Sequence, residues 1–406
     1  MSFDPLSAAE PGDGHRQMTV SPEAEIAAAS STRPADHGPH LPNPLRHPLR
    51  AMGWLVSRLF GLASLILTLS VIAAIPLLNF FALGYLLEAE GRVARSGKWR
   101  DAFPLLSIAP RIGSIALGLG FWILSLRLFS LYVADAQMID ATSAVTGRLR
   151  IILAISAALI TVHVCLALAR GGGLLCFFRP IKNAIWLRAR LRHGDYWIVA
   201  GEQLRAFLAA FRLKHHFWLG VRGYVGAAVW LFPPTALLAV GDGRDARTLV
   251  SLAGGLWLVF VLSWLPFLQA RLATENRLAA MFEPRAAINC FKRAPFAWAL
   301  STILVYALAL PLYLLKVRLP PQDAMWLATL VFIISIYPAR ILIGLAYGRA
   351  LRKQKQAWYD LTWLCRATVL AALVVFVFLL FFTQGIGEHG KRTLFEHHAF
   401  LLPWPL

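Results

Sequence analysis

The side chains of this sequence that could do chemistry are few, and the strongest candidates stand inside long apolar runs. Four of them are charged or titratable: Arg127, Arg222, Arg340 and His163. In a membrane-spanning helix a charge at the bilayer centre costs roughly 2.5–3.5 kcal/mol even on the most lenient scale, so it is seldom kept without a role. Arg340 is the best candidate, because Pro338 just before it would free backbone carbonyls and open a local polar pocket.

A second interpretation of the three arginines stays open, in which each only reaches for the membrane surface. Arg127 stands within two turns of Asp135, near the outer boundary. Arg222 follows a basic stretch, and Arg340 stands nine residues before Arg349. An arginine stem can lie along apolar surface while its guanidinium reaches the headgroups. The three side chains would then have a structural role only.

Enzymatic and metal chemistry find little support in the pattern of acids and histidines. Glu88 and Glu90 are two residues apart, so on a helix they diverge by about 200° and cannot act on one substrate atom. One group has the residue types of a metal site: Glu388, His389, Glu396, His397 and His398. Its spacing does not fit a His-Glu-x-x-His zinc helix. We therefore expect no catalytic residues, no cofactor and no metal, and hence no enzyme.

The elements that must position these side chains follow from a very apolar composition. Of 406 residues, 58% are hydrophobic and only 15% are charged, and the mean hydropathy is +0.60. Soluble proteins carry roughly 25% charged residues, which excludes a soluble globule. The four scattered cysteines exclude a disulfide-stapled module. What remains is a multi-spanning membrane protein.

Eight apolar runs are long enough to cross a membrane. About 20 residues in a helix span a hydrocarbon core of roughly 30 Å, and each run must be helical because lipid offers no partner for backbone polar groups. The runs are 59–80, 112–134, 149–169, 217–240, 249–270, 296–315, 325–347 and 363–383. The predicted fold class is all-α, a polytopic transmembrane helical bundle of about eight spans with interfacial amphipathic helices.

The loops between these runs alternate between a basic set and a less charged set. The basic set comprises 88–111, 170–216, 271–295 and 348–366. It carries 24 Lys and Arg, against 8 on the other side, and such an excess marks cytoplasmic loops. Eight crossings would then leave both termini outside. The alternative is a break at Pro76 and Asn79, with the chain returning as a hairpin, which we expect to make both ends cytoplasmic.

A weak internal repeat suggests two halves. Ile75–Asn79 has the pattern of Leu265–Gln269, and a basic linker and a further proline follow in both cases. In transporters, interrupted segments at matching positions often mark a binding site. The candidate polar pathway therefore comprises Arg340, Asn79, Gln269, Arg127 and Arg222. Because proline and an amide near a helix end are common in membrane proteins, a purely structural interpretation stays open.

The predicted organisation has four parts: a disordered N-terminal tail (1–53), a first four-span half (54–243), a second four-span half (244–383) and a C-terminal tail (384–406). The first part lacks apolar periodicity, so it cannot bury enough surface to order itself. No basic stretch followed by a short apolar region begins the chain, so we expect the first apolar run to insert the protein.

Several basic loops also show helical apolar spacing. Residues 202–213 place apolar side chains at i, i+3, i+4 and i+7 from Leu204, with charged residues opposite, and 181–192 and 278–291 look similar. Such helices lie in the headgroup layer, where each cation contributes roughly 1 kcal/mol of attraction to anionic lipid. The candidate headgroup contacts are Lys182, Arg188, Arg190, Arg192, Arg205 and Arg212. The alternative is that these cations only fix the topology.

The net charge of +19 points to the same partner. No aromatic-basic sheet pattern, finger spacing or recognition-helix pattern accompanies it, so we do not expect nucleic-acid binding. The predicted partners are membrane lipids, with anionic headgroups favoured. A protein partner is not identified by these residues.

The segment Asn79–Lys98, continued by Arg100–Pro104, combines Pro-x-x-Asn-Phe, Gly-Tyr-Leu, Gly-Arg and Ser-Gly elements. It resembles uncharacterised bacterial multi-pass membrane proteins of the domain-of-unknown-function type. The resemblance implies a bacterial cytoplasmic (inner) membrane and carries no active site over to this chain.

The expected function is that of a non-enzymatic integral membrane protein, a permease-like or lipid-interacting helical bundle. Two alternatives remain. One is a membrane scaffold that anchors a partner through the N-terminal tail. The other, less favoured, is an intramembrane lipid-modifying enzyme, which would need acidic or histidine side chains that converge in space.

Overall fold

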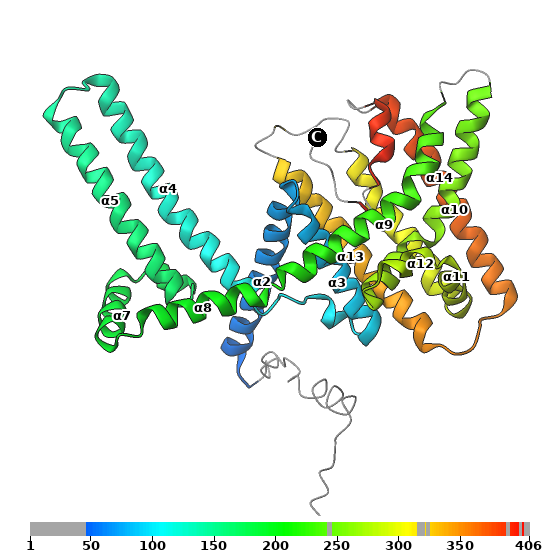
Figure 1. Ribbon diagram of the computed structural model, residues 1–406, viewed down its shortest axis with the longest axis horizontal. Coiled ribbons are helices and arrows are strands. Elements are labelled where there is room, and N and C mark those ends of the chain that lie inside the picture. Colours follow the sequence, from blue (N-terminus) through cyan, green and yellow to red (C-terminus); the bar gives the residue numbers. More distant parts are fainter. Residues whose placement is uncertain are drawn as a thin grey trace, which may run out of the picture. The chain divides into compact units, whose positions relative to one another are not determined.

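The computed structural model describes residues 46–241, 246–314, 321, 325–386, 390–397 and 400–401. In this part of the chain every regular element is a helix (Figure 1), which confirms the all-α fold class. The elements are α2 (Pro48–Ala74), α3 (Asn79–Ser96), η1 (Trp99–Ala102), α4 (Ala109–Ile139), α5 (Ala144–Ala169), α6 (Leu174–Phe177), α7 (Pro180–His193), α8 (Tyr196–Ala210), α9 (Leu213–Ala239), α10 (Ala246–Glu275), η2 (Leu278–Phe282), α11 (Pro284–Arg293), α12 (Pro295–Leu314), α13 (Met325–Arg352), α14 (Tyr359–Ile386) and η4 (Gly390–Phe395).

The chain divides by its internal contacts into two units, Met1–Trp54 and Leu55–Leu406. Residues 1–45 of the predicted N-terminal tail lie outside the described residues. The last residues of that predicted tail are helical, because α2 already begins at Pro48. All packing reported below belongs to the second unit.

Within the described residues, seven helices are long and apolar enough to cross a membrane: α2, α4, α5, α10, α12, α13 and α14. The protein is therefore a multi-pass integral membrane protein. The eighth predicted span, 217–240, forms α9, which is not among the seven. Helix α9 carries Lys214, Arg222 and an internal Pro233–Pro234 pair, and it lies against α3 and α10. Neighbouring helices cover much of its surface, so it needs less apolar surface than a lipid-facing helix.

The break considered at Pro76 is present. Helix α2 ends at Ala74, and α3 begins at Asn79 after a turn in which Leu77 has a φ of 67°. Proline lacks the N–H that would continue the helix, and its ring clashes with the preceding turn. Figure 1 shows α3 running back in the direction opposite to α2.

Helix α3 is an inner helix of the bundle, since 13 of its 18 residues are buried. It packs against α9, α10 and α13. A Cβ at Gly84 would lie 1.7 Å from the carbonyl oxygen of His216, and a Cβ at Gly220 would lie 1.9 Å from that of Phe80. Glycines allow helix backbones to touch in membranes, so α3 and α9 pack backbone against backbone.

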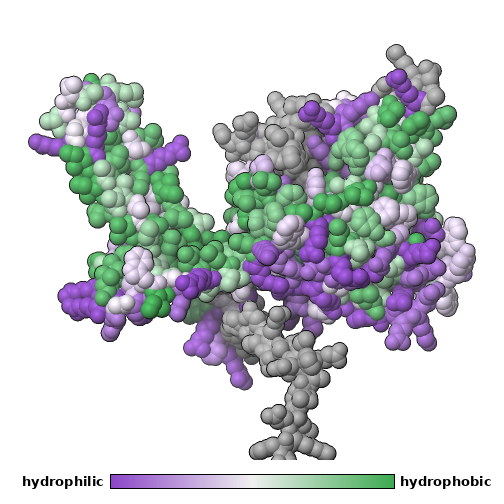
Figure 2. All heavy atoms as spheres, in the orientation of Figure 1, coloured by the Kyte–Doolittle hydropathy of each residue, from purple (hydrophilic) through white to green (hydrophobic). Residues whose placement is uncertain are grey.

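The connections of the second unit sort to two ends (Figure 1). Helices α7, α8 and α11 and the α13–α14 connection lie at one end, and the tip of the α4–α5 hairpin lies at the other. Hydrophilic residues gather along the first end, below a hydrophobic band (Figure 2). We call the first end the basic end, because the four basic loops of the sequence meet there.

The described residues after α14 lie at the end opposite the basic end, where η4 packs on α14 and α9. The expectation that a hairpin would place both ends of the chain on the cytoplasmic side stays a prediction, because residues 1–45 lie outside the described residues.

The two predicted halves, 54–243 and 244–383, do not form separate units. The most extensive helix contacts in the second unit include α9 with α10 and α3 with α13, and both pairs cross residue 243. From Leu55 onward, both halves belong to the single compact unit Leu55–Leu406. The second repeat lies inside α10 and is buried, whereas the first forms the exposed turn before α3, of which only Asn79 is buried. Helices α3 and α10 nevertheless pack against each other.

Candidate functional site

Three helices bring two opposite charges and an amide together in the bundle interior. Arg340 Nη1 on α13 donates to Glu90 Oε2 on α3 at 3.1 Å and to Gln269 Oε1 on α10 at 2.7 Å. All three residues are 0–1% exposed. A charge buried without a partner costs several kcal/mol, so either charge depends on the other. We call Glu90, Gln269 and Arg340 the central cluster.

The remaining polar atoms of the central cluster are only partly paired. Gln269 Nε2 donates to the carbonyl oxygens of Gly223 and Phe400, at 3.3 Å each. Glu90 Oε1 and Arg340 Nε have no hydrogen-bond partner among the described residues. Buried polar atoms are nearly always paired, so these two point to a further polar group such as a water or a ligand.

The structure joins two of the five residues of the predicted polar pathway, Arg340 and Gln269. Asn79 begins α3, and its Oδ1 atom has no partner in the described part of the chain. Arg127 is exposed on α4. The Nη1 and Nη2 groups of Arg222 donate to the backbone oxygen and Oδ1 of Asn276, the residue that follows α10. The last three have separate surroundings, so the five residues do not line one path.

Glu90 belongs to the cluster, although its divergence from Glu88 on a helix argues against the two as a catalytic pair. A signal was present, because a basic residue deep in one apolar helix favours an acid deep in another. Helix α13 continues through Pro338, and the Arg340 guanidinium pairs with side chains of α3 and α10. That Pro338 opens a polar pocket stays a prediction.

Glu88 anchors a second charged group near the basic end. Its carboxylate is 2.9 Å from Arg92 Nε and 3.1 Å from His215 Nε2, and Arg95 and Arg212 approach to 3.7 and 3.9 Å. A single carboxylate therefore faces three guanidinium groups. A net positive charge remains where α3 meets the start of α9.

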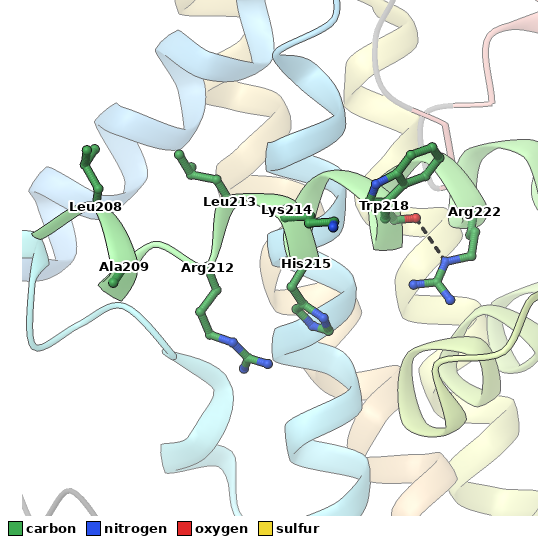
Figure 3. Close-up of a pocket in the computed structure, with 8 residues that line it drawn as sticks. All are labelled: Leu208, Ala209, Arg212, Leu213, Lys214, His215, Trp218 and Arg222. Carbon is green, nitrogen blue, oxygen red and sulfur yellow. Dashed lines mark hydrogen bonds between the residues drawn. The ribbon is translucent and has the colours of Figure 1, made fainter. Parts of the chain in front are cut away.

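A groove of 710 Å³ opens beside this group, where α8 turns into α9 (Figure 3). Its lining residues are Leu208, Ala209, Arg212, Leu213, Lys214, His215, Trp218 and Arg222. Figure 3 shows Arg212 and His215 directed to one side of the chain and Leu208 and Leu213 to the other. The turn itself is made by Arg212, whose φ of 47° lies in the left-handed region. We call this space the elbow groove.

A second groove, of 530 Å³, is also lined by apolar and cationic side chains. It lies between α5 and α7 and is lined by Val162, Leu166, Ala184, Leu187, Arg188, Leu191 and Arg192. Both grooves combine apolar walls with two or more cations. We call this one the hairpin groove.

The six predicted headgroup contacts lie on α7, on α8 and at the turn after α8, which ends at Ala210. The interfacial placement of these helices stays a prediction. Arg212 lines the elbow groove, and Arg188 and Arg192 line the hairpin groove. Arg190 donates to Asp195 Oδ2 at 2.6 Å. Lys182 and Arg205 are exposed.

His163 ties α5 to the short helices that follow it. Its Nε2 atom lies 2.8 Å from the carbonyl oxygen of Phe177, which also accepts from Trp122 Nε1 at 2.9 Å. Asn183 Nδ2 donates to the carbonyl oxygen of Cys176 at 2.8 Å, and its Oδ1 accepts from Arg170 at 3.1 Å. These bonds fix α6 and α7 to the α4–α5 hairpin.

Of the metal-like group after α14, Glu388, His389 and His398 lie outside the described residues. His397 is 3% exposed and forms a hydrogen bond with Thr235 Oγ1 at 2.9 Å. In the described part of the chain, no three His, Cys, Asp or Glu residues lie close enough to hold a metal ion.

Comparison of the chain with protein-family models, with curated proteins and with solved structures returned no match. The geometry of the two grooves and of the central cluster is therefore the basis for any statement about function.

Proposed function

We propose that this protein is a non-enzymatic membrane protein of the bacterial inner membrane that binds anionic lipids at its basic end. The observation that supports this most is the pair of grooves, each with apolar walls and a rim of cations. A phospholipid offers the matching chemistry, because its phosphate is anionic and its acyl chains are apolar. The resemblance of Asn79–Pro104 to bacterial multi-pass proteins favours the bacterial inner membrane. This location stays a prediction.

The exposure of α7 and α8 supports the same proposal. Helix α8 buries none of its 15 residues, and α7 buries only Asn183. Large apolar side chains on them stay open to the surroundings, among them Ile181, Ile185, Trp197 and Ile198. A helix with uncovered apolar residues beside arginines is typical of a membrane surface, where both kinds of side chain are solvated.

The test compares lipid binding by the full-length protein and by a variant with Arg212→Gln and Lys214→Gln. Each cation contributes about 1 kcal/mol, so the variant should bind anionic lipid about 30-fold more weakly in nanodiscs with a phosphatidylglycerol fraction that is titrated upward. The matched control is Arg148→Gln with Arg150→Gln, two exposed cations at the start of α5, away from the basic end. Equal losses in both variants, or none in either, would refute a specific basic-end site.

A scaffold function through the N-terminal tail remains the alternative. It depends on residues 1–53, most of which lie outside the described residues. Deletion of residues 1–45 should then abolish co-purification of a protein partner and leave membrane insertion intact. Unchanged co-purification would exclude the scaffold.

A further inference from the structure

The segment that follows α14 is packed into the bundle from the end opposite the basic end. Thr393, Leu394, His397 and Phe400 are each 0–3% exposed. The ring of Phe395 contacts that of Phe232 on α9, with ring centroids 5.7 Å apart. Residues 390–397 and 400–401 therefore occupy a space between helices. We call these residues the C-terminal segment.

Polar bonds from three helices hold this segment. Thr235 on α9 bonds to His397, and the hydroxyl of Tyr313 on α12 donates to the carbonyl oxygen of Glu396 at 3.0 Å. Gln269 on α10 donates to the carbonyl oxygen of Phe400 at 3.3 Å. Most of these contacts involve backbone oxygens, which an incoming ligand oxygen can replace.

Phe400 is the part of the segment that reaches the central cluster. The guanidinium carbon of Arg340 lies 6.0 Å from the centre of its ring, and the ring of Tyr306 lies 5.8 Å away. The segment thus covers the central cluster from one side. If Phe400 withdrew, Gln269 would lose one of its two acceptors, and one face of Arg340 would be uncovered.

The hydrogen-bonding groups exposed by this withdrawal match a zwitterion. Gln269 Nε2 and Arg340 Nε would be donors in need of an acceptor, and Glu90 Oε1 is an acceptor without a donor. A simple carboxylate would satisfy the donors but would leave a net negative charge, because Glu90 already neutralises Arg340. A solute with a carboxylate and an ammonium group satisfies both kinds of atom at zero net charge.

We propose that the C-terminal segment is a plug in a solute-binding site whose floor is the central cluster, and that the site takes a small zwitterion of the amino-acid type. The plug occupies the site with its own carbonyl oxygen and aromatic ring. Solute and plug compete for Gln269, so binding of one releases the other. The plug enters from the end opposite the basic end, and no residue of the central cluster lines either lipid groove.

The first test measures access to the site in the full chain. A single cysteine replaces Thr235, which is fully buried beside His397, and the four native cysteines are replaced by alanine. A membrane-impermeant maleimide should label this cysteine slowly. Adding Leu394→Asp and Phe400→Asp places charges at buried plug positions and should raise the labelling rate about tenfold or more, because the open form changes from a minor to the major state.

The matched control is Arg392→Asp, which adds the same acid at an exposed position of η4 and should leave the labelling rate unchanged. Rapid labelling of the cysteine without the plug substitutions would overturn the plug. So would an unchanged rate when Leu394 and Phe400 are both Asp.

The second test needs no variant and identifies the ligand class. Hydrogen exchange of the unmodified protein is followed with a mixture of the twenty L-amino acids, and then with single ones. A bound amino acid should speed exchange in residues 393–401 and slow it in α3 around Glu90. Its N-acetyl and decarboxylated analogues, which each lack one charge, should have no effect. Unchanged exchange with all twenty, or an equal effect of the analogues, would overturn the zwitterion site.

Discussion

The α4–α5 hairpin and the inner helices α3 and α13 show two ways to build a membrane protein. The most apolar windows of α4 and α5 have hydropathies of 1.8 and 2.6, and only 11% of each window is buried in the protein. The window of α13 has a hydropathy of 2.0 and is 50% buried. Hydropathy of a window therefore reports that a helix suits lipid, and it does not report whether lipid or protein covers it.

The stabilising interactions differ accordingly. The hairpin leaves its apolar side chains to the lipid and is joined to α6 and α7 by a few hydrogen bonds around His163 and Asn183. The inner helices touch backbone to backbone and enclose a charged pair. Substitutions at buried contacts should thus cost much more in the inner helices than similar ones in the hairpin.

The largest expected effect comes from Gly84→Ala. The new Cβ would lie 1.7 Å from the carbonyl oxygen of His216, so α3 and α9 must separate, and we expect a loss of more than about 4 kcal/mol in the free energy of unfolding. Unfolding in mixed micelles, followed by circular dichroism, measures it. Gly120→Ala on α4 is the control, because its Cβ would meet nothing within 4 Å. Similar free energies of unfolding for the two variants would show that the α3–α9 contact is no more sensitive to substitution than the hairpin.

A somewhat smaller loss is expected for Glu90→Gln, which leaves Arg340 buried without a counter-charge. Breaking such a pair costs about 3–5 kcal/mol. The double variant Glu90→Leu with Arg340→Met should recover most of this stability, since it removes both charges together. The same unfolding assay decides it, and a double variant as unstable as the single one would show that packing, and not charge, holds α3 to α13.

Where α7 joins the hairpin, Asn183→Ala should have a moderate and local effect. It removes the bonds to Cys176 and Arg170 and should cost about 2 kcal/mol. Hydrogen exchange should speed up in α6 and α7 and remain slow in α3. Faster exchange in α3 would mean that the two regions unfold together and are not stabilised separately.

The smallest effect is expected for Leu159→Ala, at a lipid-facing position of α5 that is 65% exposed. Surface substitutions usually change stability by less than about 0.5 kcal/mol. Leu86→Ala on α3, at a fully buried position, should lose about 2–5 kcal/mol. Equal losses, measured by unfolding in lipid bicelles, would show that α5 has a protein partner in the membrane.

Much of the fold follows from local sequence patterns. Seven of the eight apolar runs form helices long and apolar enough to cross a membrane, Pro76 indicated the break before α3, and the spacing around Leu204 predicted a helix in the region of α8. These features depend on residues close together in the chain. Hydropathy predicts α9 as an eighth equivalent span, because it does not show that the neighbours of this helix are mostly protein.

The candidate site was less predictable. Arg340 and Gln269 were selected, whereas Glu90 and Phe400 were not, because their partners are 250 and 131 residues away in the sequence. The C-terminal segment was expected to be a tail, since a stretch with Gly, His and Lys carries no helical apolar pattern. Its burial depends on the space between helices, which no local pattern describes.

The separation of Glu90 and Arg340 has a consequence for biosynthesis. A ribosome adds about 5–20 residues per second, so Glu90 emerges about 12–50 s before the arginine that neutralises it. During that interval α3 cannot take its final place among the helices. The nascent protein must therefore assemble its centre last, after α13 has left the ribosome, and a chain stalled before that point would present an uncompensated acid to the insertion machinery.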